Sequence, residues 1–262
     1  VSDSMIDLFP DSFEGYHYKF AILMELGNIA DAKIVLDRAI TLFPDDPGFK
    51  LDKVHFLERE KNFAEAEKLL DDSFFEAPDS AEYAKLKVQL LLQQEKIEEA
   101  AIVAEKALNS TFDEELNFYL ANIYFSTEQY RKAAESTQRT VNANSQSVYY
   151  FTALYFNALA HKKMGEDTAE QFNATIKQLR VACSKNPGMI DLYIYRALCY
   201  KEVKNYERAY EMVDYILAVS EDAPEALLIR AEINKEQGKL SQYEADRAEA
   251  LKRNPKLANI IM

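Results

Sequence analysis

The sequence predicts an all-α fold of antiparallel helix pairs stacked in tandem, and three observations lead to this prediction. Residues that break helices are scarce, with 6 glycines and 7 prolines among 262 residues. Prolines and small residues recur at intervals of 34 residues. Within each interval, apolar residues follow the three- and four-residue spacing of amphipathic helices. Because one helix pair cannot bury its apolar faces alone, neighbouring pairs are expected to stack into a solenoid.

The interval is clearest in the positions of proline and alanine. Pro10, Pro44 and Pro78 are spaced by 34 residues, and the same distance separates Ala32 from Ala66. The phase continues toward the C-terminus in two further series: Ala182, Ile216 and Ala250, and Ala197 and Ala231. A chance match does not keep its phase over this many periods, so we interpret the chain as a tandem array.

The first complete period illustrates the expected unit of helix, turn and helix. Residues 13–26 carry apolar side chains at helical spacing, and Gly27 then offers a left-handed conformation that ends the helix. Residues 29–43 form the second expected helix, which Pro44 terminates. Pro47 follows at the expected start of the next helix, a position that tolerates proline.

These residues resemble the tetratricopeptide repeat family, whose pattern combines an aromatic residue in the first helix with alanines in the second and a closing proline. The repeat that begins at Phe13 supplies Tyr16, Phe20, Leu23, Ala32, Leu36, Ala39 and Pro44 at the family's positions. The repeat that begins at Ile190 supplies Tyr193, Ala197, Tyr200, Ala209, Val213 and Ile216, with Glu221 in place of the proline. The resemblance implies a right-handed superhelical solenoid.

The phase of the repeat also gives the expected domain boundaries. Seven complete repeats are expected within residues 13–257, at 13–46, 47–80, 81–113, 114–147, 148–189, 190–223 and 224–257. Residues 1–12 are expected to form the second helix of a preceding repeat, which suggests that the chain starts inside a larger protein. Residues 258–262 are expected to be a short C-terminal tail.

The fifth repeat departs from the regular interval. Ala133 and its counterpart Thr175 are 42 residues apart instead of 34, so this repeat is expected to have elongated helices or a longer turn. Thr168 and Gln171 have the spacing of a capping box, in which two side chains close the start of a helix. We therefore expect the second helix of this repeat to begin next to Thr168, and we leave the register of its first helix open.

Composition excludes several classes of function. The net charge of −13 disfavours nucleic acid as a partner, because binding to phosphates needs a basic surface. No window of 18 uninterrupted apolar residues occurs, so no membrane span is expected. Two cysteines cannot build a disulfide framework, and we therefore expect a reducing compartment, the cytoplasm. The oligomeric state is left open.

The sequence contains no recognisable constellation of catalytic or metal-binding residues. His17, His55 and His161 are isolated from one another, and none has the short spacing to a second ligand that metal sites use. Cys183 and Cys199 are expected to be buried, unreactive thiols. No glycine-rich phosphate loop or nucleophile elbow is present. We therefore expect no enzyme activity, no cofactor and no metal.

The resemblance instead directs attention to the concave groove, which the first helices line in this family. The family's groove positions, carried over to this sequence, give seven candidate contact residues: Tyr18, Phe118, Tyr119, Asn122, Tyr155, Phe156 and Tyr195. Exposed aromatic side chains tend to mark interaction sites. The Lys and Asn residues with which some family members clamp acidic chaperone tails are not recognisable here, since Phe118 replaces a key lysine. The acidic surface favours a basic or apolar ligand.

Two functions remain open. The first is a protein-interaction scaffold that binds a peptide or protein segment in its groove. The second is a structural or regulatory arm of a larger protein, for example a J-domain co-chaperone, an enzyme or a secretion component, whose activity lies outside this segment.

Overall fold

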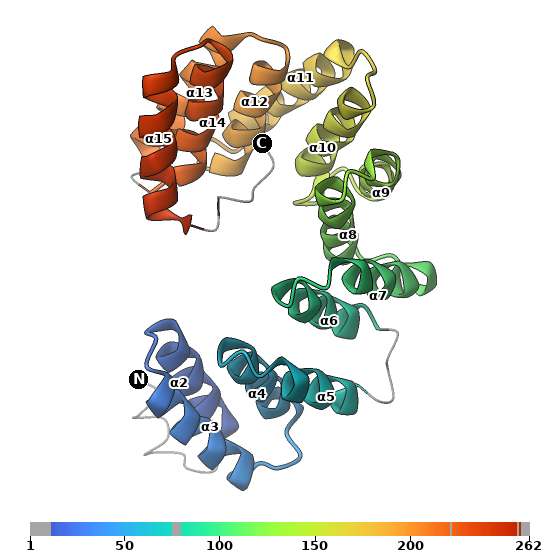
Figure 1. The fold of residues 1–262 in the computed structure, drawn as a ribbon, viewed down its shortest axis with the longest axis vertical. Coiled ribbons are helices and arrows are strands. Elements are labelled where there is room, and N and C mark those ends of the chain that lie inside the picture. Colours follow the sequence, from blue (N-terminus) through green and yellow to red (C-terminus); the bar gives the residue numbers. More distant parts are fainter. Residues whose placement is uncertain (1–11, 75–79, 221, 256, 258–262) are drawn as a thin grey trace. The chain divides into compact units, whose positions relative to one another are not determined.

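The computed structural model describes residues 12–74, 80–220, 222–255 and 257. Within these residues it contains fourteen α-helices, α2 to α15, and no β-strand (Figure 1). The all-α fold predicted from the repeat is therefore confirmed, while the right-handed sense of the superhelix stays a prediction. Apart from Ser12, the expected partial repeat at 1–12 and the expected tail at 258–262 lie outside the described residues.

The chain divides into two compact units, residues 1–116 and 117–262, and the boundary falls within α8. The helices of the first unit are α2 (Phe13–Glu25), α3 (Ile29–Leu42), α4 (Pro47–Arg59), α5 (Phe63–Ser73), α6 (Ala81–Gln93) and α7 (Ile97–Ser110). The helices that follow are α8 (Glu114–Ser126), α9 (Tyr130–Ala143), α10 (Tyr150–Lys163), α11 (Ala169–Lys185), α12 (Ile190–Glu202), α13 (Tyr206–Val219), α14 (Pro224–Glu236) and α15 (Leu240–Arg253).

The alanines that mark the repeat are the points of closest helix packing. Ala32, Ala66, Ala100, Ala133 and Ala209 have no exposed surface. Each lies near the start of the second helix of a pair, where a larger side chain would hold the two helices apart. The interval of 34 residues therefore reflects one packing requirement that returns in these five pairs.

The turn between the two helices of a pair needs a backbone with positive φ. Gly27, with φ of 72°, supplies it in the first pair, as the sequence predicted. Lys61 and Glu128 adopt the same conformation in later turns, with φ of 58° and 59°. The turn is thus set by the geometry of the stacked pair and does not depend on glycine.

The fifth repeat accommodates its extra residues in both of the expected ways. Helix α11 has 17 residues, and residues 164–168 form a long turn before it. Thr168 is the N-cap of α11, but its side chain makes no capping hydrogen bond, so the predicted capping box is wrong. Asp167 takes over this role, because its Oδ1 accepts a hydrogen bond from the backbone N–H of Ala169 at 3.1 Å.

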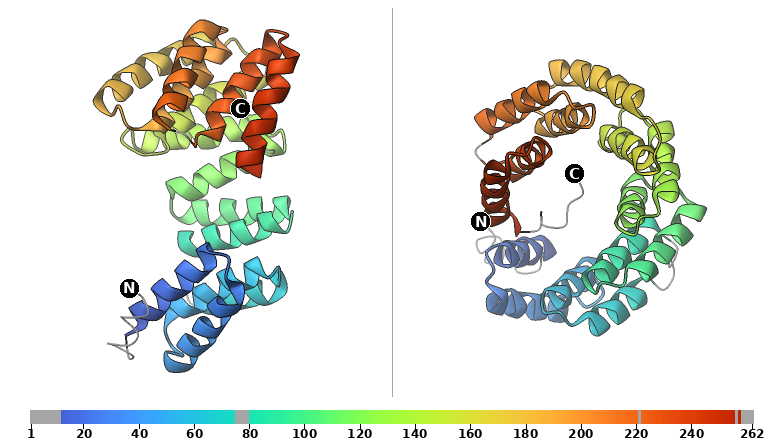
Figure 2. Two further views of the ribbon diagram at one scale, coloured as in Figure 1. Left: turned by 90° about the vertical axis from the view of Figure 1, so that its left-hand side faces the viewer. Right: turned by 45° about the horizontal axis from the view of Figure 1, so that its top comes forward.

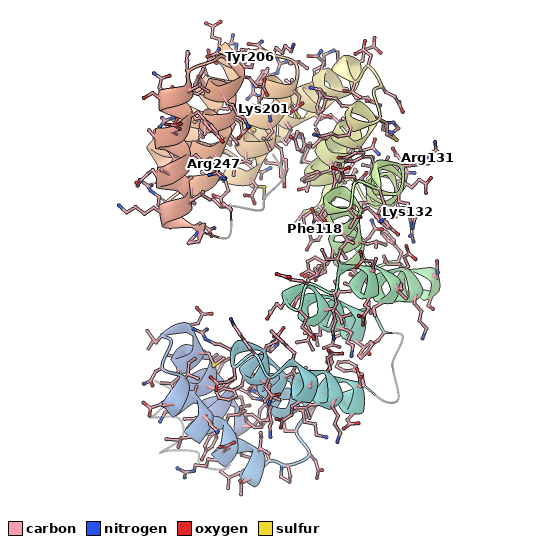
Figure 3. All side chains as sticks on the ribbon, viewed as in Figure 1. Phe118, Arg131, Lys132, Lys201, Tyr206 and Arg247 are labelled. Atoms are coloured by element: carbon pink, nitrogen blue, oxygen red, sulfur yellow. The ribbon has the colours of Figure 1, made fainter. Side chains whose placement is uncertain are left out.

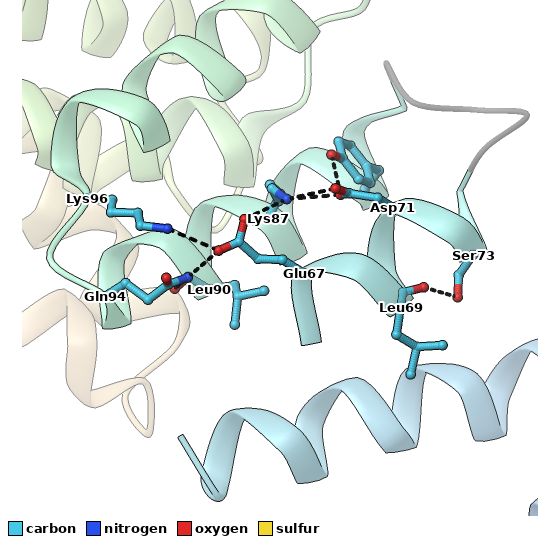
Figure 4. A network of polar contacts seen from close by, with 9 residues as sticks. Glu67, Leu69, Asp71, Ser73, Lys87, Leu90, Gln94 and Lys96 are labelled. Atoms are coloured by element: carbon cyan, nitrogen blue, oxygen red, sulfur yellow. Dashed lines mark hydrogen bonds and ion pairs between the residues drawn. The ribbon is translucent and has the colours of Figure 1, made fainter. Parts of the chain in front are cut away.

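A polar network joins α5 to α6 and to the turn that follows α6 (Figure 4). The carboxylate of Glu67 lies 3.0 Å from Lys87 Nζ and 3.2 Å from Lys96 Nζ. It also accepts a hydrogen bond of 2.8 Å from the Gln94 side chain. Although partial burial favours the neutral acid, these contacts lower the pKa of Glu67 to about 2.

Glu67→Gln is expected to lower the free energy of unfolding by about 1–2 kcal/mol at neutral pH, because a charge-assisted network is lost. The ordinary pKa of the group is 4.5, so its contribution is full above that pH and disappears as the pH falls toward 2. The stability difference between wild type and variant should therefore shrink in acid, as measured by urea unfolding across this range. Asp72→Asn, an exposed change of the same charge on α5, is the control; an equal effect there would contradict the assignment.

Across the described residues, no helix combines the length and the apolar content that crossing a membrane requires.

Candidate functional site

The first helices of three successive pairs form one side of the second unit. Helix α12 contacts both α10 and α14, while α11 and α13 pack behind them (Figure 2). This arrangement arises because each first helix is buried on the side that meets its own second helix, which leaves its other side to its neighbours. The side chains between these three helices form the candidate groove.

An open pocket of about 430 Å³ lies between the N-terminal halves of α12 and α14 and reaches α10. Its wall is mainly apolar and comes from Phe156, Ile190, Ile194, Tyr195, Leu198 and Ala223. Its remaining lining is polar and comes from Asp191, Ser220, Asp222 and Glu225. The volume lies within the range of pockets that hold a ligand group.

Two of the seven predicted contact residues, Phe156 and Tyr195, line this pocket. Both side chains are partly exposed. Burial raises the pKa of the Tyr195 hydroxyl, so this group is neutral at physiological pH. An aromatic pair of this kind offers apolar contact area with few rotatable bonds to immobilise.

Tyr155 does not contact the solvent, contrary to the expectation that it grips a ligand. Its side chain has no exposed surface, and its ring packs 5.2 Å from that of Phe156 and 6.0 Å from that of Tyr195. The family's groove positions assigned Tyr155 to the groove in a repeat whose register the sequence left open, and the structure places its side chain in the core. The buried ring of Tyr155 packs against the rings of Phe156 and Tyr195, which line the pocket.

Phe118, which Figure 3 labels on α8, and Asn122 line a second depression between α8, α9 and α10. Phe125 and Phe156 close it with ring centroids 5.2 Å apart, and the space that remains is about 10 Å³. That space holds at most one water molecule and no side chain. The amide of Asn122 already donates a hydrogen bond of 3.0 Å to the carbonyl of Phe118 on its own helix.

The two other predicted residues lie elsewhere. Tyr119 is half-buried on α8 and does not line the open pocket. Tyr18 belongs to the first unit, on α2, where its side chain is 60% exposed. A ligand-binding role for either residue stays a prediction.

The sequence reasoning missed the acidic part of the pocket. Asp191 and Glu225 occupy the second position of the sixth and seventh expected repeats, and Asp222 precedes the latter. The recurrence of an acidic residue at equivalent positions of adjacent repeats was the signal that could have identified them. Among the described residues, none of these three carboxylates makes an ion pair.

Two other acidic groups of the second unit, Glu202 and Asp246, do have basic partners. At the C-terminal end of α12, where Figure 3 labels Lys201, the carboxylate of Glu202 lies 2.7 Å from Lys162 Nζ and 3.1 Å from Lys201 Nζ. Although burial favours the neutral acid, Lys201 and Lys162 keep the pKa of Glu202 below its ordinary value. Asp246 likewise accepts hydrogen bonds of 2.9 and 2.7 Å from Arg230. The carboxylates of the open pocket have no such partner among the described residues.

Groups with chemical reactivity are placed in unreactive surroundings. Cys183 and Cys199 are both buried, and burial raises the pKa of each thiol, which disfavours the nucleophilic thiolate. Across the described part of the chain, no group of three or more His, Cys, Asp or Glu residues is arranged to hold a metal ion.

Residues 23–90 match the family model of the tetratricopeptide repeat. No curated protein matches the sequence. The fold is similar to a tetratricopeptide repeat protein from Parabacteroides merdae ATCC 43184, with a TM-score of 0.66, 17% identity and coverage of 92% of this chain and 93% of that chain. It is also similar to TTC0263, a thermophilic tetratricopeptide repeat protein of Thermus thermophilus, with a TM-score of 0.54, 25% identity and coverage of 66% of this chain and 90% of that chain.

A third similar structure is the hetero-tetramer Cut9–Hcn1 of the APC/C, with a TM-score of 0.57, 15% identity and coverage of 87% of this chain and 44% of that chain. These similarities agree with the described helix pairs and with the alanines that are buried at the repeat interval. The chain therefore has the all-α repeat fold of tetratricopeptide repeat proteins, and residues 23–90 match that family by sequence.

Proposed function

We propose that the second unit is a protein-interaction module that holds a peptide or protein segment in the open pocket between α10, α12 and α14. Repeat solenoids are in general scaffolds whose extended surfaces bind other proteins, and they are typically not catalytic. The observation that carries the proposal is the pocket itself, an opening of about 430 Å³ with Phe156 and Tyr195 in its wall.

The chemistry of the pocket supports a polypeptide ligand over the alternatives. A nucleic acid would bring phosphates to three carboxylates and to a chain of net charge −13, which is electrostatically unfavourable. A polypeptide can bring apolar side chains to the wall of the pocket and a backbone to its rim. Among the similar structures, Cut9 is found in an assembly with another polypeptide, Hcn1.

The proposal is tested by selecting a random nonapeptide library, displayed on phage, against the full chain. Wild type should enrich a recurrent set of peptides, and the Phe156→Ala/Tyr195→Ala variant should bind them at least about tenfold more weakly, since both aromatic walls are lost. Ile194→Gln, which changes one residue of the pocket wall, should also weaken the binding of these peptides. Thermal unfolding establishes that each variant is folded.

Tyr150→Ala is the matched control, because the Tyr150 hydroxyl bonds to Gln178 of α11 and the residue does not line the pocket. This variant should retain the affinity of wild type for the selected peptides. Peptides that bind all variants equally would place the binding surface elsewhere. The absence of any enrichment would favour the alternative proposal, in which the repeats are a structural or regulatory arm of a larger protein.

A further inference from the structure

We propose that the open pocket receives a lysine or arginine side chain of the bound segment, an inference that rests on the function proposed above. The aliphatic part of this side chain would lie on the apolar wall of the pocket. Its charged end would lie at the acidic rim to which Asp191, Asp222 and Glu225 contribute.

The charge of the pocket is not compensated by the described residues. Asp191, Asp222 and Glu225 line one space, and no described basic side chain forms an ion pair with any of them. Asp191 and Glu225 also stabilise the N-termini of α12 and α14, because acidic groups in a first turn interact favourably with the helix dipole. Asp222 lies directly before Ala223, the N-cap of α14, and is exposed.

The composition of the pocket matches an amphipathic cation. Phe156, Ile194 and Leu198 provide an apolar wall next to the acidic groups. Lysine and arginine bury an aliphatic stem on such a surface while they keep a charged end at a polar rim. The rings of Phe156 and Tyr195 add a surface on which a cation is attracted to the aromatic face.

Other occupants fit less well. A purely apolar side chain would fill the wall but would remove water from the nearby carboxylates without pairing them, which costs free energy. An acidic side chain would be repelled. A metal ion is disfavoured, since the described residues contain no group of three His, Cys, Asp or Glu side chains placed to hold one. An organic cation is the chemistry that satisfies both parts of the pocket.

The test uses the full chain and the peptides that the phage-displayed nonapeptide library yields with wild type. These peptides should be enriched in lysine or arginine at one position, and replacing that residue by norleucine should weaken binding by about tenfold, the loss of a charge-assisted contact. Replacing lysine by arginine at that position distinguishes the two cations, because arginine can pair with a carboxylate through two hydrogen bonds.

A matched pair of charge variants tests whether the cation binds in the open pocket. Asp191→Asn/Glu225→Gln should lose the preference for the cation, so that the lysine and norleucine forms of a peptide bind with equal affinity. Glu207→Gln/Glu244→Gln changes the net charge of the chain equally at exposed positions on α13 and α15 and should keep the preference. Raising the salt concentration should weaken the binding of the lysine peptide more than that of the norleucine peptide.

The outcomes separate the inference from the proposed function. Peptides that depend on Phe156 and Tyr195 but show no preference for a cation would overturn the inference and leave the proposed function standing. A cation preference that persists in Asp191→Asn/Glu225→Gln would also overturn the inference, because the cation would then bind elsewhere. Peptides that do not depend on the pocket aromatics would overturn both.

Discussion

Asn117→Leu is expected to lower the free energy of unfolding by about 2–4 kcal/mol, the largest effect that we predict for a single substitution. Asn117 lies on α8 with no exposed surface. Its amide donates hydrogen bonds of 2.8 Å to the carbonyl of Ser136 and to the hydroxyl of Thr140, both on α9. The hydroxyl of Ser136 in turn donates to Asn117 Oδ1 at 2.9 Å. Leucine would leave these buried groups of α9 without their partner.

The measurement is urea unfolding of wild type, Asn117→Leu, Ser136→Ala and the double variant. Because the two side chains belong to one network, the double variant should lose clearly less stability than the sum of the two single variants. Additive losses would show that the two residues act independently. A loss below about 0.5 kcal/mol in Asn117→Leu, the range of an ordinary surface substitution, would contradict the role assigned to the amide.

Ala209→Leu is expected to lower the free energy of unfolding by about 1–3 kcal/mol, because it adds volume where two helices are in closest contact. Ala209 has no exposed surface and lies on the face of α13 that also buries Val213 and Ile216. Helix α13 packs against α12 and α14, so the larger side chain must displace backbone in a closely packed stack.

Ala218→Leu provides a control on the same helix, since Ala218 is exposed and leucine has nearly the helix propensity of alanine. This variant should change the stability by no more than about 0.5 kcal/mol. The comparison, made by thermal and urea unfolding, separates packing from local propensity. Equal stability of Ala209→Leu and wild type would mean that the small residue at this repeat position is not required for packing.

The buried face of α9 illustrates what local patterns could not predict. Its buried residues include Ala133, which the repeat anticipates as small, but also Ser136, Thr137 and Thr140. Two asparagines satisfy these polar groups from α8 and α10, and Asn157 Nδ2 of α10 donates a hydrogen bond of 2.9 Å to the carbonyl of Ala134. Residues 19 and 23 positions apart meet there, and no spacing within one helix indicates such a pairing.

The candidate site, too, was predicted from the sequence only in part. The sequence predicted that Phe156 and Tyr195 belong to a groove, and both line the open pocket. The same reasoning placed Tyr155 in that groove, although it is fully buried beneath both rings. Adjacent residues on a helix point about 100° apart, and only the packing around α10 decides which of Tyr155 and Phe156 faces the open pocket. Phe118 follows the right spacing, but the depression beside it is closed by Phe125 and Phe156.

The sequence by itself determined the class of fold, because periodic alanines such as Ala32 and Ala209 report a packing requirement that recurs in most of the helix pairs. It also determined the acidic character of the surface. Only the tertiary structure decided where the groove is open, since that depends on how the side chains of three helices fill the space between them. It alone brought Asp191, Asp222 and Glu225 around one apolar wall, because Asp191 and Glu225 are a full repeat apart in the sequence and meet only when α12 and α14 stack.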